Sequence, residues 1–209
     1  MNAPHRSRAG VQGAVYTLRC FVAFDLAPNV LTKIGELQRQ LAATDADVRW
    51  VRPEGMHATL KFLGRVKTDC LPRLQSALTA AVCEQSALRL QVRGLGAFPN
   101  LRRPQVLWVG FVGSGLQELA RSVDAVAMTL GFEAENRAFH GHVTLGRVNS
   151  LRGWPQLEAL FKEHLNDDFG STEVRSVVLY RSQLQAGGSV YSALWTIPLQ
   201  QNKGGHHDD

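Results

Sequence analysis

Cysteine and long apolar runs are both scarce in this chain of 209 residues. The three cysteines, Cys20, Cys70 and Cys83, are odd in number and show no C-x-x-C spacing. This scarcity argues against a disulfide framework and against a zinc finger, and it predicts a reducing, cytoplasmic setting. No segment approaches the roughly 20 continuous apolar residues of a membrane span, so we expect no membrane association.

The two ends of the chain lack the apolar patterns of folded elements. The N-terminal segment is basic but has no apolar core of the secretory type. Gly10 and Gly13 disfavour the helix of a mitochondrial presequence, which is the alternative. We therefore expect disordered tails at residues 1–18 and 200–209, and one bilobal domain at residues 19–199.

Acidic residues are fewer than basic ones, 18 against 23, which gives a net charge of +5 and a pI of about 9.4. A basic surface suits a polyanionic partner such as RNA, although many basic proteins bind no nucleic acid. Composition alone therefore leaves RNA binding open.

Hydrophobic periodicity predicts strands that alternate with helices along the chain. A helix is expected to start at Pro28, in the first turn where proline is preferred, with Val30, Ile34, Leu37 and Leu41 on one face. The predicted strands cover residues 19–26, 47–51, 57–64, 87–98, 106–112, 142–148, 173–184 and 189–199, and the further helices cover residues 70–83, 115–130 and 154–165.

The second half of the chain repeats the element order of the first half. His142 follows His57 by 85 positions, and the strands near residues 106 and 174 each follow an earlier strand by 86 positions. These offsets indicate two copies of one β-α-β-α-β lobe. The turn-rich segment 98–105 separates the copies.

Several predicted strands alternate apolar and polar residues, which favours antiparallel or mixed sheets. The alternative, a parallel doubly wound sheet, requires strands with continuous apolar runs. We therefore predict an α+β fold of two pseudo-symmetric lobes around a central cleft. Each lobe is expected to be a mostly antiparallel sheet with helices on the outside.

Both halves contain the pattern His-x-Thr-Leu inside a predicted strand, as HATLKFLG and as HVTLGRV. Side chains alternate between the two faces of a strand, so His57 and Thr59 are expected to share one face. The same count places His142 and Thr144 together. Each strand therefore presents an imidazole beside a hydroxyl group, with an apolar surface behind them.

Strict alternation also assigns the other side chains of the first motif strand. Ala58, Leu60 and Phe62 are expected to face a core. Lys61 is expected to share the face of His57, where it either contacts a substrate or is simply solvated.

Two lobes packed together would bring both His-x-Thr strands to one cleft. Two imidazoles with pKa values near 6.5 suit concerted catalysis, because one takes a proton from a nucleophile while the other gives a proton to a leaving oxygen. The hydroxyl groups would donate hydrogen bonds to an anion between them, which suits a phosphodiester. This arrangement requires no metal ion and no other cofactor.

With these motifs the chain resembles the 2H phosphoesterase superfamily over residues 19–199, and within it the RNA 2′,3′-cyclic phosphodiesterases, historically called 2′-5′ RNA ligases. The segments that carry the resemblance are RCFVAFDLAPNV, HATLKFLG, FHGHVTLGR and YRSQLQAGGSVYSAL. The resemblance implies the bilobal fold. It also implies hydrolysis of RNA or nucleotide 2′,3′-cyclic phosphates to 2′-phosphomonoesters.

The resemblance further implies roles for individual residues. His57 would be the proton donor to the leaving 3′ oxygen and His142 the proton acceptor that activates water, although near-symmetry allows the two labels to be exchanged. Thr59 and Thr144 would bind the phosphate. Arg147 would be another phosphate ligand if a bulge or the strand end turns it toward His142, since strict alternation points it away.

Two positions depart from the family pattern. Gly141 stands where proline usually precedes the second histidine. Arg65 stands where an acidic residue often follows the first motif, and it adds positive charge near the mouth of the cleft.

These residues also have simpler interpretations. Two unrelated histidines and strand-forming threonines would give similar motifs, but the repeat spacing disfavours coincidence. His140 and His142 could bind a metal ion, yet the sequence offers no third ligand. Phe21, Trp108 and Tyr191 either stack on a base or, as is commoner for aromatic residues in strands, fill a core.

Two alternative functions remain open on the sequence alone. The same histidines could join RNA ends through a 2′-5′ bond by microscopic reversibility, or the chain could be a non-catalytic RNA-binding module. Arg102 and Arg103 in the interlobe loop either attract RNA or are ordinary solvated charges. We expect a monomer whose partners are RNA ends or nucleotides that carry a 2′,3′-cyclic phosphate.

Overall fold

The computed structural model describes residues 15–185 and 188–201. The expected terminal tails lie mostly outside the described residues. The first strand already begins at Thr17, so the folded domain starts slightly before the expected residue 19.

The elements follow the predicted alternation of strands and helices. Among the described residues they are β1 (Thr17–Phe24), α1 (Pro28–Ala42), β2 (Val48–Trp50), the 3₁₀ helix η1 (Pro53–Gly55), β3 (Ala58–Lys67), the 3₁₀ helix η2 (Thr68–Cys70), α2 (Leu71–Val82), β4 (Leu88–Phe98), β5 (Val106–Val112), α3 (Leu116–Thr129), β6 (His142–Val148), α4 (Trp154–Glu163), β7 (Asp168–Val174), β8 (Ser176–Gln185) and β9 (Gly188–Pro198). In α1, the predicted apolar face is buried as expected.

The single strand predicted at residues 173–184 is in fact two strands. β7 ends at Val174 and β8 begins at Ser176. β7 pairs with β4, whereas β8 pairs with β1, so the chain crosses from one side of the sheet to the other at Arg175. The sequence of β7, DFGSTEV, has few apolar residues, which is why periodicity identified only its last residues.

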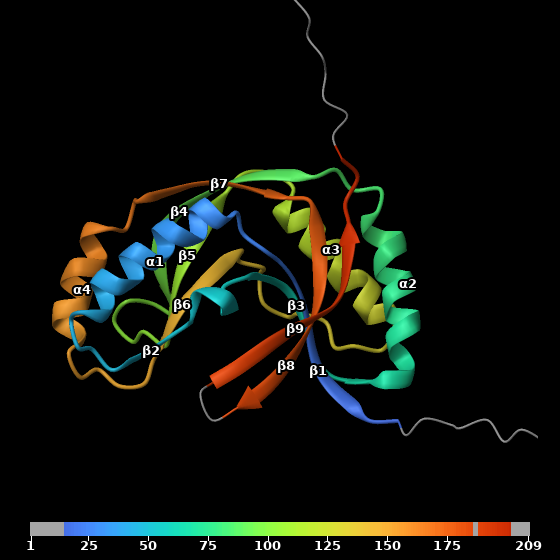
Figure 1. Ribbon diagram of the computed structural model, residues 1–209, viewed down its shortest axis with the longest axis horizontal. Helices are drawn as coiled ribbons and strands as arrows, with labels where there is room; N and C mark the ends of the chain where they lie inside the picture. Colours follow the sequence, from blue (N-terminus) through green and yellow to red (C-terminus); the bar gives the residue numbers. More distant parts are fainter. Residues whose placement is uncertain (1–14, 186–187, 202–209) are drawn as a thin grey trace, which may run out of the picture.

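All the described strands belong to one sheet with the order β7-β4-β5-β6-β3-β1-β8-β9, and β2 pairs with β6. Each of these strand pairs is antiparallel. At the middle of the order, β3 and β6 are joined by one residue pair, Ala58 with Val143. The sheet curls strongly around this junction, with the helices on its outside (Figure 1). The α+β class and the antiparallel pairing are confirmed.

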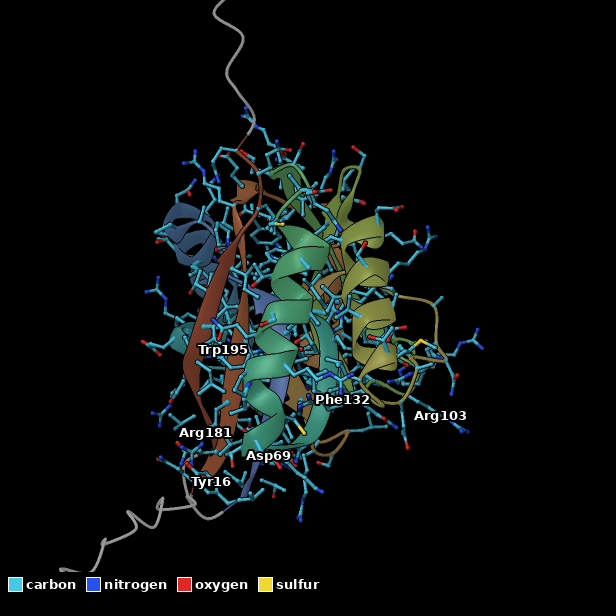
Figure 2. The ribbon with its side chains drawn as sticks, turned by 90° about the vertical axis from the view of Figure 1, so that its right-hand side faces the viewer. Tyr16, Asp69, Arg103, Phe132, Arg181 and Trp195 are labelled. Carbon is cyan, nitrogen blue, oxygen red and sulfur yellow. The ribbon has the colours of Figure 1, made fainter. Side chains whose placement is uncertain are left out.

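The two halves of the sheet are not the two halves of the sequence, which corrects the expected lobe organisation. β4 comes from the first half of the chain but pairs with β5 and β7, while β8 and β9 come from the second half and extend the sheet from β1. The helices are exchanged as well: α2 contacts α3, and α1 contacts α4. Figure 1 shows these helix pairs on opposite sides of the molecule, and Figure 2 shows α2 and α3 side by side.

Both motif strands contain a β-bulge at the leucine that follows the threonine. In β3, Thr59 and Lys61 pair with neighbouring residues of β1, and Leu60 between them is unpaired. In β6, Leu145 is unpaired in the same way against β5. An extra residue shifts the alternation, so the side chains after a bulge point to the opposite face from the one that strict alternation predicts.

The bulge in β3 overturns two expectations. Phe62 does not fill the core, because its side chain is 63% exposed. Lys61 does not share the face of His57: it is 5% exposed and lies on the helix side of the sheet. There its Nζ pairs with Oδ1 of Asp124 at 2.5 Å and donates to the carbonyl oxygen of Glu133 at 2.5 Å.

Candidate active site

The two His-x-Thr motifs meet where β3 and β6 pair. His57 immediately precedes Ala58, and His142 immediately precedes Val143. Because Ala58 pairs with Val143, the two histidines lie at the same junction of the sheet although they are distant in the sequence. A positive charge on His142 lowers the pKa of His57, as expected for imidazoles that face one region.

The threonines lie at the same junction. Continuing the antiparallel register by one residue in each direction places His57 opposite Thr144 and Thr59 opposite His142. All four side chains are partly buried rather than sealed in the core. The structure therefore brings together the four residues that the sequence singled out.

Aromatic rings enclose the imidazole of His57. Phe21 stacks on it with ring centroids 4.7 Å apart, and Tyr191 meets it edge-on at 4.9 Å. Tyr180 lies 5.9 Å from His57, and its hydroxyl group donates to Oδ1 of Asp25 at 2.6 Å. These contacts hold the imidazole in place and remove it from most of the solvent.

A corresponding set of contacts holds His142. Its Nδ1 lies 2.7 Å from the carbonyl oxygen of His140. Because a carbonyl oxygen only accepts hydrogen bonds, Nδ1 carries the proton, and Nε2 of the neutral ring is left as a proton acceptor. Phe98 packs edge-on against His142 at 4.9 Å, and Trp108 lies 6.5 Å away.

Two glycines make room for this second set of contacts. Gly96 is opposite Trp108 in the β4–β5 pair, and a Cβ there would lie 2.1 Å from Cζ2 of the indole. A Cβ at Gly141 would lie 2.6 Å from Cδ2 of Leu116, so a larger residue before His142 would require this leucine to move.

Burial lowers the pKa of both histidines, but their charged neighbours differ. Desolvation lowers the pKa of His57 to about 4, against smaller raising contributions from a hydrogen bond to the Gly55 backbone and from the charge of Asp25. Desolvation also lowers the pKa of His142, against a raising contribution from its hydrogen bond to the His140 backbone, and the charges of His140 and Arg147 lower it further. A nearby carboxylate thus favours the protonated form of His57, whereas cations disfavour that form of His142.

The prediction for Arg147 required a bulge or a strand end that turns its side chain toward His142. The bulge at Leu145 meets this requirement. Beyond the bulge, alternation turns Arg147 to the face of His142, and its charge lowers the pKa of that histidine. The register of β2 with β6 places Arg49 directly opposite Arg147. Sequence reasoning missed Arg49, because no local pattern indicates that the short strand β2 pairs beside the second motif.

The aromatic candidates lie beside the two histidines, whereas Arg103 of the interlobe loop lies away from them. Phe21 is 3% exposed, but it lies outside the main hydrophobic core cluster and is buried on the site face of the sheet, where it stacks on His57. Trp108 and Tyr191 are partly buried and pack beside the two histidines. Arg103 is exposed at the edge of the molecule, where its side chain points outward (Figure 2).

Within residues 15–185 and 188–201, no three His, Cys, Asp or Glu side chains are grouped so that they could hold a metal ion. In the same part of the chain, no helix is both long and apolar enough to cross a membrane. The three cysteines are free thiols, and burial raises the pKa of the Cys20 thiol to about 11.

Known proteins resemble this chain over most of its length. The family described as LigT like Phosphoesterase matches residues 24–108 and 111–191. An RNA 2′,3′-cyclic phosphodiesterase of Aeropyrum pernix is 36% identical over 168 residues, which are 79% of this chain and 94% of that protein. A second one, from Methanothermobacter thermautotrophicus, is 34% identical over 183 residues, which are 87% of this chain and 99% of that protein.

Solved structures give the same result. The protein TT0787 of Thermus thermophilus superposes with a TM-score of 0.76 at 25% identity, covering 87% of this chain and 98% of that chain. E. coli LigT complexed with 3′-AMP superposes with a TM-score of 0.73 at 26% identity, covering 89% of this chain and all of that chain.

Proposed function

Because the chain belongs to the LigT-like phosphoesterase family and is similar to RNA 2′,3′-cyclic phosphodiesterases, we propose that it hydrolyses RNA or nucleotide 2′,3′-cyclic phosphates to 2′-phosphomonoesters. The observation that carries the proposal is the meeting of two His-x-Thr motifs at the junction of β3 and β6. Two imidazoles and two hydroxyl groups around one phosphate are what acid–base hydrolysis of a phosphodiester needs.

In the proposed complex, the cyclic phosphate lies between the two motifs. The hydroxyl groups of Thr59 and Thr144 donate to its non-bridging oxygens, and the guanidinium group of Arg147 neutralises part of its charge. These donors stabilise the additional negative charge that develops when a nucleophile attacks phosphorus.

The reaction then needs two proton transfers. Water attacks the phosphorus and its proton passes to Nε2 of His142, whose Nδ1 is held by the carbonyl oxygen of His140. The bond between phosphorus and the 3′ oxygen breaks, and His57 gives its proton to that oxygen. The phosphate remains on the 2′ oxygen as a monoester.

The charged neighbours of the histidines support this assignment of roles. Asp25 favours a protonated His57, while the charge of Arg147 favours a neutral His142. Burial nevertheless holds the pKa of His57 near 4, so the negative charge of a bound cyclic phosphate must raise this pKa before His57 donates a proton at neutral pH.

The direct test is incubation with a 2′,3′-cyclic nucleotide in the presence of EDTA, followed by separation of 2′- and 3′-phosphate products. We expect the 2′-phosphate, because the 3′ oxygen is the leaving group. Release of the 3′-phosphate would reverse the proposed orientation of the substrate. Tight binding without turnover would instead support a non-catalytic RNA-binding module.

The pH dependence provides a second prediction. The value of kcat/KM reports pKa values of the free protein, and the pKa of each histidine is lowered from 6.5. Falling pH protonates the base and rising pH deprotonates the acid, so we expect a bell-shaped profile with its maximum below pH 6.5. Initial rates on a cyclic mononucleotide between about pH 4 and pH 9 check this.

The variant Asp25→Asn refines the pH experiment. It removes a charge that raises the pKa of His57, so the limb of the profile that reports His57 should move to lower pH. A flat profile, or a maximum above neutral pH in the unmodified protein, would contradict the two-histidine mechanism.

The same two histidines also allow 2′-5′ ligation of RNA ends by microscopic reversibility. Water at its bulk concentration favours hydrolysis over ligation. We further propose that the protein acts as a monomer in the cytoplasm and without a cofactor.

A further inference from the structure

A second group of cations lies beyond the candidate active site on β1 and β3. Arg19 is directly opposite Arg65 in the register of these strands, and Lys67 lies opposite Thr17 two residues further along. All three cations are exposed. In the described part of the chain, none of them forms an ion pair with a carboxylate.

The neighbouring residues show which face the Arg19–Arg65 pair occupies. Leu18 and Val66, which pair with each other one residue away, are buried in the core at 8% and 1% exposure. The arginines therefore point to the opposite face of the sheet. Phe21, two residues after Arg19, is on that face and stacks on His57, so the arginine pair shares its face with the site.

Aromatic rings fill the space between the histidine and the arginine pair. Phe62 is opposite Phe21, is 63% exposed, and has its ring centroid 6.0 Å from that of Phe21. On the other side, Tyr180 stacks on Phe21 at 5.4 Å. Exposed rings next to a cationic row are typical of surfaces that bind single-stranded nucleic acid, because bases stack on the rings and phosphates meet the cations.

The distance between the pair and the motif indicates which part of a substrate the pair could reach. Ala23 is opposite Thr59, and Arg19 lies four residues before Ala23. At about 3.3 Å per residue, this places the arginine pair about 13 Å from the phosphate-binding threonine. That is longer than one sugar–phosphate repeat, so a mononucleotide held by the histidines does not extend to the pair.

We propose that β1 and β3 bind the RNA chain upstream of the terminal cyclic phosphate, with a base stacked on Phe62 and a backbone phosphate held by Arg19 and Arg65. A cyclic phosphate closes the 3′ end, so the remaining chain extends only from the 5′ oxygen of the last sugar. Like charges directly opposite each other repel, and a phosphate between them relieves this repulsion. The preferred substrate class is therefore an oligoribonucleotide end, an inference that rests on the proposed function.

The test compares the variant R19Q/R65Q with the unmodified protein on two substrates. One is a 2′,3′-cyclic mononucleotide, and the other is a short oligoribonucleotide that ends in a 2′,3′-cyclic phosphate. We expect kcat/KM for the oligoribonucleotide to fall, and the slope of its logarithm against log salt concentration to weaken by about 0.7 for each lost phosphate contact. The loss for the mononucleotide should be much smaller.

A matched control is R39Q/R121Q, which removes the same charge from exposed positions on α1 and α3. This control should keep the preference for the oligoribonucleotide. An equal loss on both substrates in R19Q/R65Q would overturn the proposal. An equal loss of oligoribonucleotide activity in the control would also overturn it, because net charge would then explain the effect.

A binding measurement separates this inference from the proposed function. Fluorescence anisotropy with a labelled oligoribonucleotide that ends in a 3′-phosphate does not depend on turnover. If the unmodified protein hydrolyses neither substrate, the proposed function fails, but weaker binding by R19Q/R65Q alone would still support the RNA-binding role of β1 and β3. Equal binding by all three proteins would exclude that role.

Discussion

Replacement of His57 or His142 by alanine is expected to lower kcat/KM for a 2′,3′-cyclic nucleotide by about 10²- to 10⁴-fold, because each change removes one of the two proton transfers. The double variant should be little worse than either single variant, since residues that act as one unit have non-additive effects. Steady-state rates at the pH optimum of the unmodified protein provide the measurement.

His164 offers a matched control for these variants. Its Nδ1 lies 2.7 Å from Oδ2 of Asp167 at the end of α4, outside the His-x-Thr junction. His164→Ala should therefore keep the activity. Thermal melting of each variant separates loss of catalysis from loss of folding, because His57 packs among aromatic rings. Full activity in a folded His57→Ala or His142→Ala protein would refute the mechanism.

The variant Asp124→Ala is expected to lower the free energy of unfolding by about 3 to 5 kcal/mol. The side chain of Lys61 is 4% exposed, and Asp124 is its ion-pair partner at 2.5 Å. Without this carboxylate, the buried ammonium group keeps the hydrogen bond to the carbonyl oxygen of Glu133 and a weaker electrostatic interaction with Glu135. Urea unfolding should show a lower midpoint at an unchanged slope.

Glu118 on the same helix provides the control. It pairs with Arg121 at 3.8 Å, and both side chains are largely exposed, so Glu118→Ala should cost less than about 1 kcal/mol. The variant K61M/D124L removes both charges and should recover much of the loss, because apolar residues can replace a buried ion pair. If Asp124→Ala were no less stable than Glu118→Ala, the buried pair would have no structural importance.

The sequence was sufficient to identify the two strands that contain the His-x-Thr motifs. The pattern His-x-Thr-Leu is local, it occurs twice, and its spacing of 85 residues is visible without coordinates. The buried face of α1 was likewise predictable, since helical periodicity depends only on neighbouring residues. The catalytic roles of His57 and His142, and the phosphate contacts of the threonines and Arg147, remain predictions.

Alternation within the motif strands could not be predicted in the same way. The bulges at Leu60 and Leu145 arise from the way β3 pairs with β1 and β6 pairs with β5. In each pair, the partner strand lies far away in the sequence. These bulges expose Phe62, bury Lys61 and turn Arg147 toward the face of His142. A one-residue shift in pairing reverses the side chains that follow it up to the next bulge, so no local pattern contains this information.

The amino-acid sequence by itself determined most of the helices and strands, although not the separation of β7 from β8, and it determined which side chains can transfer protons and which family the chain resembles. All of these depend on short-range patterns. The tertiary structure decided that β4, β8 and β9 are exchanged between the halves of the chain and that one residue pair joins β3 to β6. It also decided which cations face the histidines. These features depend on the pairing of distant strands, and pairing is a property of the whole sheet rather than of any segment in it.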